Sequence, residues 1–142
     1  MSNTPGEDKL RKYTDDEFLE TLIQEVTLNG LYFDITITIH GQLFTGTVIS
    51  GREFFEACGQ VFNDRNLPTE TIIQPFLDSY PNQQSVDGTI DVEIKPVAYL
   101  HLKNVQVVTA TGNAPLLSEL PYWRFLISRI DGWTFGKLKM PS

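Results

Sequence analysis

The sequence contains little of what metal sites and disulfide-rich folds require. One cysteine, Cys58, and two histidines, His40 and His101, stand among 142 residues. A single cysteine cannot form an internal disulfide, which is typical of a protein kept in a reducing cytosol. His40 falls in a predicted turn and His101 in a predicted strand, and neither has a partner at the ligand spacing of a zinc site. We therefore expect no metal and no cofactor.

Positive charge and long apolar runs are also scarce. Eleven Lys and Arg residues stand against 18 Asp and Glu residues, which leaves a net charge of -7. Binders of nucleic acid need a cationic face, so this balance disfavours nucleic acid and, equally, an anionic membrane surface. No apolar run approaches the roughly 20 residues that span a bilayer, and the polar residues 1–12 do not predict a signal peptide. The composition predicts an acidic, cytoplasmic protein.

Common nucleotide-binding and hydrolase motifs are missing as well. The sequence has no P-loop, no dinucleotide-binding glycine pattern and no Gly-x-Ser-x-Gly elbow. Cys58 lies on the apolar stripe of a predicted helix, where a buried structural thiol is more common than a nucleophile. The acidic residues 15–17 are explained by helix capping and the helix dipole. The sequence therefore predicts a protein that is not an enzyme.

The strongest pattern that is present is the period-two alternation that begins at residue 31. It predicts a strand with one face on a core and the other in water. A two-residue turn at His40-Gly41 would place Ile35 opposite Gly46 in a second strand. Histidine fits positive φ imperfectly, so a longer loop with a bulge is the alternative. A glycine facing a core isoleucine leaves room for a bend, which predicts a curved or barrel-forming hairpin.

Two amphipathic helices flank this hairpin. Thr14 and Glu17 form a capping box that opens the first helix, and residues 29–30, Asn-Gly, end it. Ser50 and Glu53 repeat the capping box at the start of the second helix. Both helices carry an apolar stripe at helical spacing, which predicts that each lies across a face of the sheet.

The rest of the chain predicts one more helix and several strands. Pro75 should kink or split the helix, and a phase shift near Lys103-Asn104 predicts a β-bulge in the longest strand. The patterns predict the helix over residues 72–80 and a polar loop over 81–89. They then predict a short strand over 90–95, a long strand over 99–109 and a second loop over 110–121.

Residues 122–138 predict a second hairpin with Asp131-Gly132 as a type I′ turn. Its register would place Ile127 opposite Gly136. Both of its faces are apolar, so helices or a partner must cover both. The face that should be core carries Trp123, Phe125, Ile127 and Leu138. The candidate partner-binding surface carries Leu126, Ile130, Trp133 and Phe135, with Arg124 beside it.

These patterns predict one α+β domain over residues 13–142, preceded by a disordered tail over residues 1–12. The fold class is a strongly curved antiparallel sheet, or a small open barrel, of about five strands flanked by two or three helices. A rival hypothesis is a small-ligand-binding or enzymatic domain with a pocket on the curved sheet. Its polar anchors would be Tyr99, His101, Lys103 or Arg124, although a solvated strand face explains the first three more simply.

Three ordered blocks of residues carry a resemblance to a known family. They are Asp34 to Phe55 with its glycines at 41 and 46, then His101-Leu102-Lys103-Asn104, then Trp123-Arg124 with Asp131-Gly132 and Gly136-Lys137. Their order and spacing resemble the gas vesicle accessory protein U family over residues 31–64 and 99–139. The resemblance implies a non-enzymatic role in gas vesicle formation or clustering, in the cytosol of a buoyant microbe. The implied partners are the vesicle shell, other accessory proteins or copies of the protein itself, and no catalytic residue is carried over.

Overall fold

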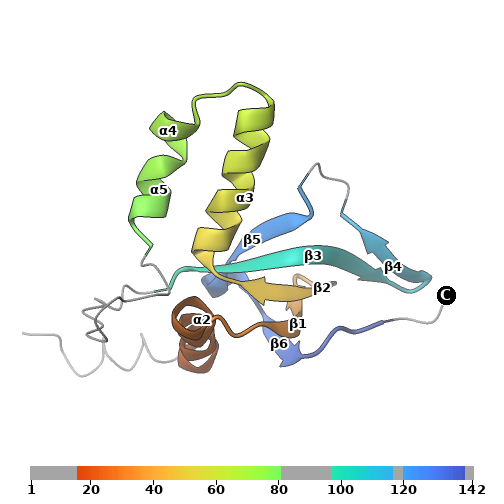
Figure 1. Ribbon diagram of the computed structural model, residues 1–142. Coiled ribbons are helices and arrows are strands. Elements are labelled where there is room, and N and C mark those ends of the chain that lie inside the picture. Colours follow the sequence, from red (N-terminus) through yellow and green to blue (C-terminus); the bar gives the residue numbers. More distant parts are fainter. Residues whose placement is uncertain (1–15, 81–96, 117–119, 140–142) are drawn as a thin grey trace, which may run out of the picture.

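The computed structural model describes residues 16–80, 97–116 and 120–139. In chain order its elements are α2 (Glu17–Asn29), β1 (Phe33–Ile39), β2 (Gln42–Ile49), α3 (Gly51–Asp64), α4 (Thr69–Ile72), α5 (Gln74–Asp78), β3 (Tyr99–Thr109), β4 (Gly112–Pro115), β5 (Tyr122–Leu126), the 3₁₀ turn η1 (Ile127–Arg129) and β6 (Gly132–Phe135). The strands form one antiparallel sheet. Figure 1 shows α2 on one side of this sheet and α3, α4 and α5 rising from the other.

The sheet is open and curved, and its strand order is β4-β3-β2-β1-β6, with β5 paired to β3. The predicted α+β class with a curved antiparallel sheet is confirmed. The sheet has six strands in the described ranges, because residues 112–115, predicted as part of a loop, pair with the end of β3 as β4. The predicted tail over residues 1–12, the loop over 81–89 and the strand over 90–95 lie outside the described residues.

The first hairpin has the predicted register, with Ile35 opposite Gly46. Its turn is the two-residue form, because His40 and Gly41 both have positive φ, at 49° and 78°. His40 is held in this conformation by Asp131, whose carboxylate accepts a hydrogen bond from the His40 backbone N–H at 2.7 Å. A tertiary contact thus stabilises a histidine where local preference favours Asn or Gly.

The predicted bulge in β3 lies opposite Gly46. The pairing between β2 and β3 shifts register between Thr45 and Thr47, and Asn104 in β3 has a φ of 54°. A Cβ atom on Gly46 would lie 3.1 Å from the Lys103 carbonyl oxygen, which is tighter than ordinary packing. The glycine therefore admits the displaced backbone of the bulge, and the bulge bends the sheet.

The short connection from β5 to β6 also requires a curled sheet. β5 and β6 lie on opposite sides of β3-β2-β1, four strand spacings apart, which is roughly 19 Å in a flat sheet. Residues 127–131 join them and reach at most about 20 Å when fully extended, but three of them form η1 and shorten that reach. The rings of Phe44 in β2 and Phe125 in β5 confirm the curl, because their centroids lie 5.4 Å apart across the concave face.

The predicted second hairpin is wrong. β5 pairs with β3 and β6 pairs with β1, so Ile127 is not opposite Gly136. Asp131 instead contacts the first hairpin: its backbone N–H donates to the Thr38 carbonyl oxygen at 2.9 Å, and its carboxylate accepts from the His40 backbone N–H. Phe125 and Ile127 are buried as predicted, whereas Trp123 and Leu138 are exposed.

An apolar cluster lies on each face of the sheet. The larger one fills the concave face beneath α2 and contains Leu19, Ile23, Val26, Ile35, Ile37, Val48, Leu100, Leu102, Val105, Phe125 and Ile127. The smaller one lies between the convex face and α3, and contains Ile49, Phe54, Phe55 and Ile73. No helix within the described ranges combines the length and the apolar character of a membrane-spanning segment.

Helix ends follow the predictions in part. Asp16 caps α2, because its carboxylate accepts a hydrogen bond from the Leu19 backbone N–H at 2.9 Å; Thr14, the predicted cap, lies outside the described residues. Ser50 caps α3 as predicted, with its hydroxyl accepting from the Glu53 backbone N–H at 3.1 Å. The predicted third helix is split into α4 and α5, with Pro75 in the first turn of α5.

The residues after β6 form a strap, residues 136–138, that crosses the convex face. Thr36 holds it: its hydroxyl donates to the Gly136 carbonyl oxygen at 2.8 Å and accepts from the Leu138 backbone N–H at 2.9 Å. The Leu138 carbonyl oxygen accepts from the Asn113 side chain in β4 at 2.8 Å. The strap therefore links β1 to β4, strands that are not neighbours in the sheet.

Replacing Gly46 by Ala should destabilise the fold by about 1–3 kcal/mol, because the new methyl group meets the bulge backbone. Gly59→Ala in α3 is the matched control. Its Cβ would lie 3.5 Å from Ile73, an ordinary contact, and alanine favours a helix interior by roughly 0.8–1 kcal/mol. Urea unfolding of both variants checks the opposite signs. A Gly46→Ala variant as stable as the parent would contradict close packing at the bulge.

Thr36→Val should cost about 1–3 kcal/mol, because it keeps the side-chain shape but removes the hydroxyl that binds the strap. Thr38→Val on the same strand is the control, because no hydrogen bond of its hydroxyl appears among the described contacts. Amide hydrogen exchange should show lost protection at Leu138 in the first variant only. Equal exchange at Leu138 in both variants would refute the role of Thr36.

Candidate functional site

Aromatic rings gather at the β6 edge of the sheet, and we name them the aromatic patch: Phe18, Phe33, Trp133 and Phe135. The ring centroids of Trp133 and Phe135 lie 5.3 Å apart, Phe18 lies 5.6 Å from Trp133, and Phe33 lies 5.6 Å from Phe135. Trp133 and Phe135 stand opposite buried isoleucines of β1. The patch is therefore the continuation of the concave core to the surface.

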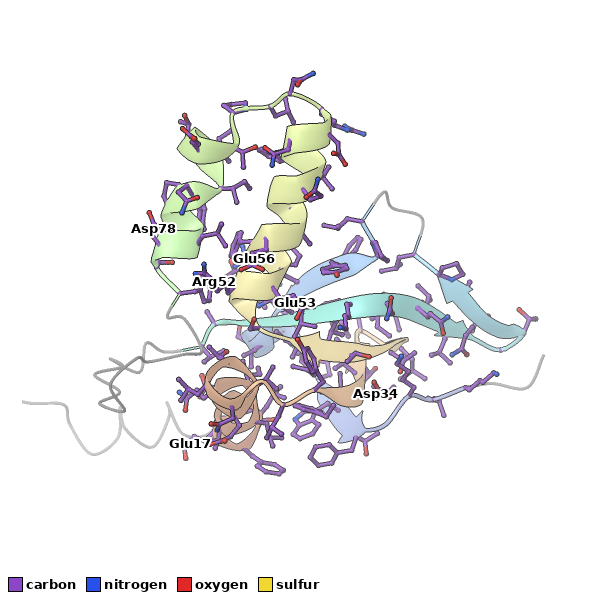
Figure 2. All side chains as sticks on the ribbon, in the orientation of Figure 1. Glu17, Asp34, Arg52, Glu53, Glu56 and Asp78 are labelled. Carbon is purple, nitrogen blue, oxygen red and sulfur yellow. The ribbon has the colours of Figure 1, made fainter. Side chains whose placement is uncertain are left out.

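Two members of the patch are mostly exposed. Phe18 is 59% and Phe135 54% exposed, and Figure 2 shows ring-bearing side chains projecting beside α2 and β6. Trp133 is partly buried, and its Nε1–H donates to the Asp16 carboxylate at 2.6 Å. Because Asp16 also caps α2, one carboxylate fixes both the helix start and the indole. The rings are thus held in place before any partner arrives.

The other residues of the predicted partner surface lie elsewhere, because the hairpin that would have joined them does not form. Leu126 is exposed on β5, on the far side of β3-β2-β1 from β6. Ile130 packs against the concave cluster. Arg124 belongs to a separate group on the convex face. The structure brings together only Trp133 and Phe135 of the predicted set.

That separate group is named the Arg124 site: Phe54, Phe55, Tyr99, His101 and Arg124. His101 and Arg124 face each other across β3 and β5. The Arg124 guanidinium carbon lies 3.6 Å from the centroid of the Tyr99 ring and 5.4 Å from that of Phe55. Phe54 and Phe55 come from α3, so the helix covers this end of the strands. Aromatic rings therefore lie next to the guanidinium, which remains partly exposed.

His101 is 3% exposed, and its ring centroid lies 4.9 Å from that of Phe54. Burial, and then the positive charge of Arg124, lower the pKa of His101 to about 3. His101 Nε2 and Arg124 Nε are both buried without a hydrogen-bond partner. The prediction of a solvated strand face is therefore wrong at His101, because α3 covers it.

Lys103, the third residue of the alternative ligand site, points to another group. Its Nζ lies 3.5 Å from a Glu53 carboxylate oxygen and 4.6 Å from the Tyr32 ring centroid. The Tyr32 hydroxyl donates to Glu53 at 2.6 Å, and this hydrogen bond raises the pKa of Tyr32. The Glu53 carboxylate therefore binds Lys103 and Tyr32. Among the described contacts, it does not form the predicted hydrogen bond back to the Ser50 backbone N–H.

Cys58 offers little nucleophilic character. It is partly buried on α3, and burial raises the pKa of its thiol although Arg124 opposes this shift. The thiolate is the reactive form. Across the described ranges, no group of three or more His, Cys, Asp and Glu side chains comes together to hold a metal ion.

Sequence reasoning did not assign Phe18, Phe33 or Asp16 to the site. A signal existed for Phe18: the buried residues Leu19, Ile23 and Val26 share one helical face, and a residue one step before Leu19 lies about 100° away from that face. Nothing local brings Phe33 to Phe135, because the two residues are far apart in the chain.

His101 should make stability fall in acid. The pKa of its imidazole is lower in the folded chain, about 3, than the usual 6.5. The unfolded chain therefore takes up a proton below about pH 6.5 while the folded chain does not, and stability is lost as the pH falls through this window. The loss between pH 7 and pH 4 is about 3 kcal/mol.

The variant His101→Phe tests this, because it keeps an aromatic ring among Phe54, Phe55 and Tyr99 and removes the titration. Urea unfolding at pH 7 and pH 4 should show a smaller acid loss in the variant than in the parent. The groups that titrate elsewhere contribute equally to both proteins. An identical acid loss in the two would mean that His101 is not buried in its neutral form.

A comparison with known families gives the chain its place. A family model described as gas vesicle protein GvpU-like matches residues 16–138, a range that contains both the aromatic patch and the Arg124 site. No curated protein and no solved structure matches the chain significantly. The match agrees with the resemblance carried by the three sequence blocks. The chain therefore belongs to the GvpU-like family of gas vesicle proteins.

Proposed function

We propose that this protein is a non-enzymatic accessory protein of gas vesicles that acts by protein–protein interaction through the aromatic patch. The observation that carries the proposal is the exposure of Phe18 and Phe135 at the end of an otherwise buried apolar face. Aromatic side chains dominate the energetics of protein interfaces. The family gives the setting, a gas vesicle system, and the patch gives the means of contact.

The patch is well prepared for binding because its rings are already ordered. Trp133 is fixed by its hydrogen bond to Asp16, and Phe135 packs edge-on against both Trp133 and Phe33. Ordering a side chain at an interface costs about 0.5–1.5 kcal/mol, and a packed ring has already lost most of that freedom. A partner therefore gains contact area at a low entropic cost.

The surroundings of the patch indicate the chemistry of the partner. Asp16, Glu17 and Glu20 stand in the first turn of α2 beside Phe18, and Figure 2 shows Glu17 on this helix. An apolar centre with an acidic rim complements a surface with an apolar centre and basic residues around it. We place such a surface on the gas vesicle shell or on another accessory protein, with a second copy of the chain as the alternative, and we place the contact in the cytoplasm.

Binding to purified intact gas vesicles tests the proposal, because gas-filled vesicles float in a centrifuge and carry bound protein with them. The double variant Phe18→Gln with Phe135→Thr should weaken binding by about 30-fold, equivalent to about 2 kcal/mol. Trp123→Thr is the matched control. Trp123 is also exposed, at 42%, but it lies on β5 beyond β3.

Two further measurements separate the outcomes. A high-salt wash should leave the parent protein on the vesicles, because salt screens charge pairs and not apolar contacts. Thermal melts should show that the double variant remains folded. Equal loss of binding in the Trp123 control would refute the patch as the contact. Absence of parent binding, together with concentration-dependent self-association, would move the partner from the shell to a second copy.

A further inference from the structure

A partly buried cation, Arg124, lies beside α3 without a counterion among the described residues. Arg124 forms no ion pair within the described ranges, and its Nε–H is buried without an acceptor. Arg52, Lys103 and Lys137 do find carboxylates there: Arg52 lies 3.0 Å from Glu56, and Figure 2 shows both residues on α3. The chain contains 18 acidic residues, and none of the described ones reaches Arg124. The lack of a partner here contrasts with the pairing elsewhere.

Neighbouring groups compensate for this charge only in part. The Tyr99 ring lies against the guanidinium and attracts its charge. An aromatic face offers no lone pair to Nε–H, and a buried donor without an acceptor is unfavourable. His101 Nε2 adds a second buried nitrogen without a partner. Among the described residues, no oxygen acceptor reaches the Arg124 Nε–H.

We propose that the Arg124 site binds a carboxylate whose remaining part is apolar. The planar fork of a guanidinium matches the two oxygens of a carboxylate. A single negative charge fits because Arg124 is the only unpaired cation among the described residues of the site: His101 is neutral there, and Lys103 is paired with Glu53. Phe54, Phe55 and Tyr99 supply the apolar walls. A dianion would need a second positive charge.

The approach to the site lies at the β5 edge. Arg124 and Tyr99 are each partly exposed, and within the described ranges β5 pairs only with β3. A ligand arriving there meets the guanidinium before the deeper His101. This site and the aromatic patch stand on opposite faces of the sheet, so the inference does not depend on the proposed vesicle contact.

Nuclear magnetic resonance of the full-length protein tests the proposal with benzoate, which joins a carboxylate to an aromatic ring. The Arg124 Nε–H and His101 ring signals should shift and saturate during the titration. Benzamide has nearly the same shape without the charge, and its binding should be at least tenfold weaker. Inorganic phosphate should also bind at least tenfold more weakly. Equal shifts with benzamide, or none with benzoate, would overturn the proposal.

Arg124→Lys is the informative variant, because it keeps the charge and removes both Nε–H and the fork. Benzoate binding should fall at least tenfold in this variant, while Arg129→Lys, on the exposed turn η1, should bind as the parent does. The Phe135→Thr variant should also bind benzoate normally, which separates this site from the patch. Unchanged benzoate binding in Arg124→Lys would refute the assignment.

Discussion

The structure depends on one constraint, the short connection between β5 and β6. Residues 127–131 must link strands on opposite sides of β3-β2-β1, so the sheet curls until its two sides approach each other. The bulge opposite Gly46 makes this curl sterically possible. The curl creates a concave face, which Phe44 and Phe125 fill from different strands, and a convex face, which α3 and the strap both contact. The aromatic patch lies at the edge of the concave face, and the Arg124 site lies on the convex face.

Different elements cover the two faces of the sheet. On the concave side, α2 seals the core but does not extend over Phe135, so the apolar surface reaches solvent as the aromatic patch. On the convex side, α3 covers the strand ends at Ile49 and His101, and the strap covers the threonine-rich middle through Thr36. The Arg124 site lies where α3 meets β5, so both candidate sites occur where a covering element ends.

Local patterns in the sequence predicted what local physics decides. The register of the first hairpin, the bulge near Asn104 and the Ser50 cap follow from nearby residues or from glycine geometry, whereas the positive φ of His40 also has a tertiary support in Asp131. The prediction of the second hairpin was wrong because β5 and β6 pair with β3 and β1, strands that are distant from them in the sequence. For the same reason the predicted partner surface dispersed, and only Trp133 and Phe135 stayed together.

The gas vesicle setting came from the resemblance to a family, because no local pattern or periodicity in the sequence indicates a gas vesicle. The Arg124 site shows the complementary case. Strand alternation alone was enough to name Tyr99, His101 and Arg124 as polar anchors. That Lys103 pairs with Glu53 and does not join them depends on the position of α3. The enclosure of the guanidinium by Phe54 and Phe55 also comes from that helix, whose placement on β3 no short-range signal encodes.

Both candidate sites carry a thermodynamic cost that the fold must offset. A domain of this size is stable by only about 5–15 kcal/mol, and an unpaired buried donor alone costs about 1–3 kcal/mol. Moving Phe135 under α2, or placing a carboxylate beside Arg124, would be a small change in sequence. A chain selected for stability alone would tend to make such changes, so departures of this kind are expected at functional sites. The exposed rings and, among the described residues, the arginine without a counterion are departures of this kind, and each is where we propose a partner.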